Sequence, residues 1–265
     1  MGRSRGTWNT KGTWLAGAAL AGVLALTGYA LLSGDGGATN SPAKGGPSGS
    51  APGSASPAPT YRAPQEWSEP QRWAALPRGQ RTDGHGSAVG FPQTAEGAVA
   101  MAAAANTTAV EDTKTNVDEQ LRIYRSYLGA ADQSAQNAEQ IELQALQTDK
   151  ALARQMGVSA GQPLPPGAYV RSTVVGYKVI KKAPAEVSVW LLSRVVQKSG
   201  ETAKEHGSYS RTLAGAQWTD GDWKLTGAAT ERAQQDAQAQ AQPPMAAPGD
   251  AAFNSAGWTA IREAS

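Results

Sequence analysis

The feature that most constrains the fold is a series of four strand-like segments in the second half of the chain. They are rich in Val, Tyr, Thr and Trp, are bounded by turn residues, and occupy residues 169–180, 186–197, 207–219 and 222–226. An Asp220-Gly221 pair separates the last two segments, with Trp218 and Trp223 beside it. Asp-Gly favours a two-residue hairpin because a tight primed turn needs positive φ. Since short connections join antiparallel neighbours, we expect an antiparallel meander.

A helical pattern precedes these segments. Thr94 is a suitable N-cap for a short Ala-rich helix over residues 95–106. Apolar side chains recur at helical spacing through residues 113–156, with Gly129 as the expected break. The Gly- and Pro-rich loop at 161–167 ends this stretch. The sequence therefore predicts three helices followed by the meander.

An uncharged apolar run occupies residues 14–32 near the N-terminus. A helix of that length measures about 28 Å, close to the roughly 30 Å of a hydrocarbon core. Trp14 and Tyr29 lie near its two ends, where aromatic rings favour the membrane interface, and basic residues precede it. The run predicts a single transmembrane helix in the cell membrane, with a cytoplasmic N-terminus and an extracytoplasmic C-terminal domain. A cleaved signal peptide and a buried soluble helix are the alternatives.

Composition divides the rest of the chain into segments. We expect a basic cytoplasmic flank (1–13), a disordered Gly/Ser/Pro tether (33–60), an irregular aromatic and Pro-rich arm (61–92), an extracytoplasmic α+β domain (93–230) and a mostly disordered Gln/Ala/Pro-rich tail (231–265). The tail contains a small apolar cluster of Phe253, Trp258 and Ile261. This cluster could pack back on the domain or bind a partner.

Charge and composition restrict the chemistry. Four of the 24 basic residues and one of the 22 acidic residues precede Tyr61, which leaves 20 basic and 21 acidic residues from there onward. This near balance argues against direct contact with nucleic acid. The absence of Cys excludes disulfides, thiolate metal sites and a Cys nucleophile. His85 and His206 have no acidic or Cys companions in the sequence, so we expect no metal and no cofactor.

The expected strands also offer no catalytic acid or base. Residues 169–180, 187–197 and 208–219 contain no Asp, Glu or His. The carboxylates of Asp118 and Glu119 adjoin the apolar helical stripe but are expected to face water. We therefore assign no catalytic residue and expect a protein that is not an enzyme.

Four tryptophans are candidate partner-binding residues, namely Trp67, Trp73, Trp190 and Trp258. Tryptophan is enriched where binding energy concentrates, although packing within the sheet is the alternative for Trp190. The second expected strand is apolar on both faces, so it should be covered twice. Helices could cover one face, and a second subunit or the arm could cover the other.

Helices followed by a curved antiparallel meander resemble the nuclear-transport-factor-2-like cone. Two motifs carry the resemblance, FPQTAEGAVAMAAAA at 91–105 and W-x-D-G-D-W-K-L at 218–225. With the expected anchor and tether, the chain is similar to the bitopic scaffold proteins of type IV secretion and conjugation systems, especially those of actinobacterial conjugative elements. The resemblance implies an α+β fold with an N-terminal transmembrane helix and a cone of about three helices on about four antiparallel strands.

The resemblance also implies a function. The protein would be a non-catalytic, membrane-anchored assembly scaffold of a conjugative transfer machine. Its partners would be other membrane subunits of that machine, a second copy of itself, and the lipid bilayer through the anchor. The alternative is a cell-envelope accessory protein that binds a lipid or small ligand in the cone.

Overall fold

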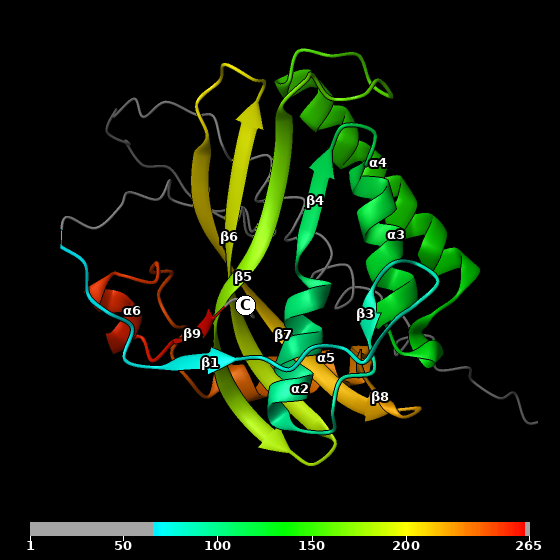
Figure 1. The fold of residues 1–265 in the computed structure, drawn as a ribbon. Coiled ribbons are helices and arrows are strands. Elements are labelled where there is room, and N and C mark those ends of the chain that lie inside the picture. The colour runs from blue at the N-terminus through cyan, green and yellow to red at the C-terminus, as the bar shows by residue number, and fades with distance from the viewer. Residues whose placement is uncertain (1–65, 263–265) are drawn as a thin grey trace, which may run out of the picture.

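The computed structural model describes residues 66–262. The predicted basic flank, apolar run and tether, together with Trp14 and Tyr29, lie outside the described residues. The strands are β1 (Trp73–Ala75), β2 (Arg81–Thr82), β3 (Ala88–Val89), β4 (Thr108–Glu111), β5 (Ala168–Ala183), β6 (Glu186–Ser199), β7 (His206–Thr219), β8 (Asp222–Leu225) and β9 (Thr259–Arg262). The main sheet has the order β1-β9-β5-β6-β7-β8, and β4 also pairs with β5 (Figure 1). β2 and β3 form a separate two-stranded sheet.

Helices cover both faces of the main sheet. They are α2 (Ala95–Ala105), α3 (Asn116–Tyr127), α4 (Ala135–Gln155), α5 (Gly227–Gln238) and α6 (Ala251–Ser255), with a 3-10 turn η1 (Ala130–Asp132) between α3 and α4. In Figure 1, α2 lies in front of the strands and α5 behind them. We call the face that α2 covers the inner face and the face that α5 covers the outer face.

The four predicted strand segments correspond to β5, β6, β7 and β8, which pair antiparallel in sequence order. The turn between β7 and β8 contains Asp220 at φ 54° and Gly221 at φ 76°. Both positive values are those that a primed two-residue turn requires. Trp218 pairs with Trp223 across this hairpin, and their rings meet edge to face at 5.5 Å between centroids.

The predicted fold class is wrong for the described chain. The sheet is mixed rather than antiparallel, because β1 and β9 pair in parallel. It has seven strands where about four were expected, and residues 66–262 contain five α-helices where three were expected. The additional strands of this sheet are β1 from the arm, β4 between α2 and α3, and β9 from the C-terminal tail. The additional helices are α5 and α6, towards the C-terminal end of the described chain.

The transmembrane, single-pass part of that prediction also requires correction. Within residues 66–262, no helix combines the length and the apolar character needed to cross a bilayer. α4 has 21 residues, but it includes Glu142, Asp149 and Lys150, which are costly in hydrocarbon. The apolar run at 14–32 lies outside the described residues.

On the inner face, α2 fills the space against the sheet. Thr94 is its N-cap, as predicted, and accepts a hydrogen bond from the backbone N–H of Gly97 at 3.0 Å. Val99 and Met101 are fully buried in one cluster with Trp223 of β8. The small side chains of this Ala-rich helix allow its backbone to approach the sheet closely.

The α3–α4 hairpin packs beside this layer. α3 begins with a capping box, in which Thr115 accepts from the N–H of Asp118 while the Asp118 carboxylate accepts from the N–H of Thr115. Gly129 lies at the predicted break and donates its N–H to the carbonyl of Leu225 at 2.9 Å. This bond ties the hairpin to β8.

On the outer face, the chain covers its own sheet. An added Cβ at Gly215 of β7 would lie 2.2 Å from the carbonyl oxygen of Ala229, so the α5 backbone rests directly on this glycine. Phe253 and Trp258 are fully buried further along the tail, in one cluster with Trp190 and Leu192 of β6. The rings of Phe253 and Trp258 stack at 6.5 Å.

The tail therefore differs from the expected disorder. Its Gln- and Ala-rich stretch forms α5, since Ala has the highest helix propensity. This helix has no stripe of bulky apolar residues, but its small Ala side chains pack closely on the Gly and Ala residues of β7. The second apolar face of β6 is covered by this tail within the same chain. The main reason for expecting an oligomer is thus accounted for within one chain.

Candidate functional site

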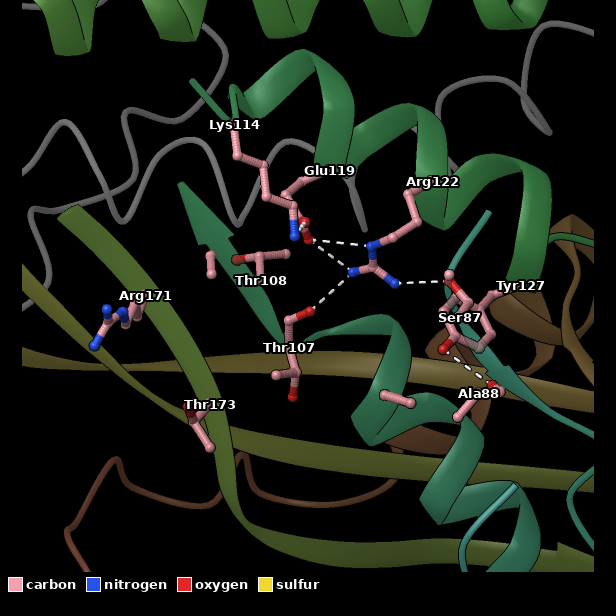
Figure 2. Close-up of a pocket in the computed structure, with 13 residues that line it drawn as sticks. Ser87, Ala88, Thr107, Thr108, Lys114, Glu119, Arg122, Tyr127, Arg171 and Thr173 are labelled. Atoms are coloured by element: carbon pink, nitrogen blue, oxygen red, sulfur yellow. Dashed lines mark hydrogen bonds and ion pairs between the residues drawn. The ribbon is translucent and has the colours of Figure 1, made fainter. Parts of the chain in front are cut away.

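A hollow of about 460 Å³ lies between α2, α3, β4, β5 and residues 86–88 of the arm (Figure 2). Glu119 of α3 is one of the residues that line it, and its side chain is only 1% exposed. Lys114 pairs with Oε1 of this carboxylate, and the Nη2 of Arg122 lies 2.7 Å from Oε2. The expectation that Glu119 faces water is wrong, because these two cations compensate its charge inside the protein.

Arg122 extends this ion pair into the neighbouring segments. Its Nη1 donates to the Ser87 hydroxyl at 2.9 Å, and its Nη2 donates to the carbonyl of Thr107 at 3.0 Å. One guanidinium therefore connects α3 to the arm and to the residue that precedes β4. We call Lys114, Glu119 and Arg122 the charged clasp.

The arm beside the clasp is held by further hydrogen bonds. Asp83 accepts from the backbone N–H groups of His85 and Ser87, each at 2.9 Å. Burial raises the pKa of Asp83, but the Ser126 hydroxyl and these two N–H groups outweigh it, so the pKa is lowered overall. Tyr127 donates to the carbonyl of Ala88 at 3.1 Å, and burial raises its pKa.

The chemistry of the clasp is structural. A general base needs a free oxygen directed at a substrate, whereas both oxygens of Glu119 are engaged by cations. Removing one partner of a buried ion pair leaves an uncompensated charge, which costs about 3–5 kcal/mol. The clasp is thus suited to hold α3 against the arm.

Metal-binding groups do not gather in the described chain. Among residues 66–262, no cluster of three His, Asp or Glu side chains has a metal-binding arrangement. His85 lies exposed in the turn after β2, and His206 lies exposed at the start of β7. The expected absence of a metal and a cofactor stays a prediction.

Two of the candidate tryptophans form a pair on the surface of the arm. Trp67 is 65% exposed and Trp73 is 36% exposed. The carboxylate of Glu69 accepts from both rings, with distances of 3.1 Å from the Trp67 Nε1 and 3.2 Å from the Trp73 Nε1. The guanidinium of Arg262 lies 5.3 Å from the centroid of the Trp73 ring. We call Trp67 and Trp73 the indole pair.

The other two candidates are buried and face the outer cover. Trp190 lies beneath Arg211, whose guanidinium is 5.3 Å from the ring centroid. Trp258 donates its indole N–H to the carbonyl of Pro244 at 2.9 Å. Both rings are enclosed by the tail, so the four candidates divide into two surface residues and two core residues.

Sequence reasoning missed the functional geometry around the indole pair and the clasp. Glu69 is an ordinary acidic residue between two tryptophans. The available signal was its spacing, two residues after Trp67 and four residues before Trp73. For the clasp, the signal was Lys114 and Arg122 at i−5 and i+3 from Glu119. Only the second spacing is typical of a helical ion pair.

Comparisons of the chain with protein-family models, with curated proteins and with solved structures give no match.

Proposed function

We propose that the protein is a non-catalytic assembly module of a conjugative or type IV secretion-like transfer machine, and that it contacts a partner protein through the indole pair. The machine is suggested by the sequence resemblance, which rests on the motifs at 91–105 and 218–225 together with the apolar run at 14–32 and the Gly/Ser/Pro-rich segment at 33–60. The contact surface is supported by one observation, the exposed Trp67 and Trp73 held by a shared carboxylate.

The indole pair has the properties of a binding hot spot. Tryptophan is enriched among the residues that dominate binding energy, and large exposed apolar groups mark interaction surfaces. Glu69 holds both rings before any partner arrives, which reduces the side-chain entropy lost on binding. The packing of Trp67 on Gly249 adds to this, since a Cβ there would lie 2.2 Å from the Trp67 ring.

Two further observations favour an assembly role over the alternatives. The buried Glu119 is engaged by Lys114 and Arg122, which fits a structural element better than a catalytic one. The inner face of the sheet is filled by side chains such as Met101 and Trp223, which favours a packed scaffold over a carrier that holds a ligand in a cone.

The test is crosslinking in the native host, followed by purification of the full-length chain and mass spectrometry. We compare the native protein with a double variant, Trp67→Ala with Trp73→Ala, and with a control, Leu143→Ala. Leu143 is an exposed apolar residue of α4 that is remote in sequence from the arm. The double variant should lose at least about tenfold of its crosslinks to a conjugative ATPase and other machine subunits, because hot-spot tryptophans contribute about 2 kcal/mol or more each.

The control variant should keep those crosslinks. Equal recovery of machine subunits with the double variant would contradict the indole pair as the contact. Recovery of no machine subunit with the native protein would contradict the assembly role itself.

A further inference from the structure

A second hollow, of about 630 Å³, lies between the α3–α4 hairpin, β4 and the loop that leads into β5. Its floor consists of Val110 and Leu152, which are fully buried in a small core cluster of their own. Val117, Leu146 and Leu164 rise around this floor as partly exposed walls. Ligand sites typically enclose about 300–1,000 Å³ and are mostly apolar, and this hollow fits both criteria.

A partly buried carboxylate is among the residues that line this cavity. Asp149 of α4 lines it, and its two oxygens accept the backbone N–H groups of Asn116 and Val117 at 2.9 and 3.1 Å. Each carboxylate oxygen accepts up to two hydrogen bonds, so a ligand donor can join this arrangement. Burial raises the pKa of Asp149, the backbone bonds oppose this, and the charge of Asp118 adds to it.

The charges around the cavity limit what can enter. Asp112 also lines it, while Lys114 lines it but pairs with Glu119 on the side of the charged clasp. Lys150 is exposed at the same rim. An anionic group placed at Asp149 would be repelled by that carboxylate, whereas an uncharged hydrogen-bond donor would meet an acceptor.

The loop at 157–167 forms one wall of the cavity. Gly157, Gly161 and Gly167 all adopt positive φ, and the loop is joined to the β4–α3 turn by the N–H of Leu164, which donates to the carbonyl of Asp112 at 3.2 Å. Leu146 on the facing helix is 38% exposed, and an apolar ligand would cover it.

We propose that this cavity binds a compact, uncharged apolar molecule that carries a hydrogen-bond donor, with Leu146 and Leu164 as facing walls and Asp149 as the acceptor. The site is separate from the indole pair and does not depend on the proposed assembly role.

The probe is N-phenyl-1-naphthylamine, an uncharged aromatic amine with one N–H, titrated into the full-length chain while its fluorescence is recorded. The variants are Leu146→Asp and a matched control, Leu143→Asp, three residues away on the same helix. Leu143 is 55% exposed and does not line the cavity. We expect saturable binding to the native protein, weakened at least about tenfold by Leu146→Asp, because a charge in an apolar wall is costly to desolvate.

Leu143→Asp should change the affinity by less than about twofold, as surface substitutions usually do. Because both variants share the full chain, binding elsewhere cancels in their comparison. If circular dichroism shows that Leu146→Asp lowers the fraction of folded protein, Leu164→Ser replaces it as the test variant. This substitution on another wall of the cavity should also weaken probe binding. A second probe, 1-anilinonaphthalene-8-sulfonate, has the same aromatic ring system with an added sulfonate. It should bind more weakly than the uncharged probe.

Three results would overturn the proposal. They are the absence of saturable probe binding to the native protein, equal affinities for Leu146→Asp and Leu143→Asp, and tighter binding of the sulfonated probe than of the uncharged one.

Discussion

The two faces of the main sheet are covered in contrasting ways. The inner face is packed by α2, which carries Val99 and Met101 into a cluster with Trp223. The outer face is packed by a tail whose first helix is mainly Gln and Ala, with its large side chains confined to Phe253 and Trp258. Both covers exclude water from the same central strand, β6.

The contrast shows that a weakly apolar segment can cover a sheet when the strand beneath it has small residues. Gly215 lets the α5 backbone lie against β7, and two aromatic rings then fill the remaining space over Trp190. The energy of the outer cover is therefore concentrated in a few positions, which substitutions can test directly.

The largest effect should come from truncating one large buried side chain on each face of the sheet, Phe253 on the outer face and Met101 on the inner face. Phe253→Ala on the outer side should destabilise the protein by about 3–5 kcal/mol, and Met101→Ala on the inner side by about 2–5 kcal/mol, because each leaves a cavity in a packed cluster. Chemical denaturation of both variants measures these values. A tail that docks only loosely would leave the midpoint of Phe253→Ala unchanged.

The next effect should come from the close approach at β7. Gly215→Ala inserts a Cβ against the carbonyl of Ala229 and should cost about 2–3 kcal/mol by overpacking. Gly207→Ala on the same strand meets no atom within 4 Å and serves as the control, with a change below about 0.5 kcal/mol. Similar thermal midpoints for the two variants would disprove the contact between α5 and β7.

The helix caps should give smaller and nearly equal effects. Thr94 caps α2 and Thr226 caps α5, each accepting from a backbone N–H at 3.0 and 3.1 Å. Thr94→Ala and Thr226→Ala should each cost about 1 kcal/mol in urea unfolding. If only Thr94→Ala lowered the free energy of unfolding, the predicted capping of α5 by Thr226 would be contradicted.

The smallest effects should appear as opposite pH dependences of two carboxylates, Asp83 in the arm and Asp149 of α4. The pKa of Asp83 is lowered from 3.8, so its contribution to stability is present above that value and is lost as the pH falls through the lower folded pKa. The pKa of Asp149 is raised from 3.8, so its contribution is full below that value and is lost as the pH rises through the higher folded pKa. Urea midpoints of Asp83→Asn and Asp149→Asn relative to the native protein, from about pH 3 to pH 7, should diverge in these opposite directions. Parallel profiles for the two variants would contradict the assigned environments.

Sequence patterns predicted the elements whose signals are local. The Asp220-Gly221 turn follows from backbone preference, and the cap at Thr94 follows from side-chain chemistry. Helices α3 and α4, with the break at Gly129, follow from apolar spacing.

The outer cover could not be predicted in the same way. α5 has no apolar stripe, and its stability depends on Gly215, which is distant in sequence. β1 and β9 are short strands that pair with each other in parallel, so neither has a hairpin signal. Trp67 and Trp73 were candidates from the sequence, but Glu69 was missed for a related reason, since it gains its role only when both rings turn toward it.

The measurement that tests this account most directly is hydrogen–deuterium exchange of the full-length chain over residues 227–262. The account predicts that the amides of α5 and of the segment around Trp258 exchange slowly, with protection approaching that of β6, because the tail and the strand share one buried cluster. Exchange of the whole segment at the rate of an unstructured peptide would contradict it. In that case the outer face of β6 would again require a second subunit to cover it.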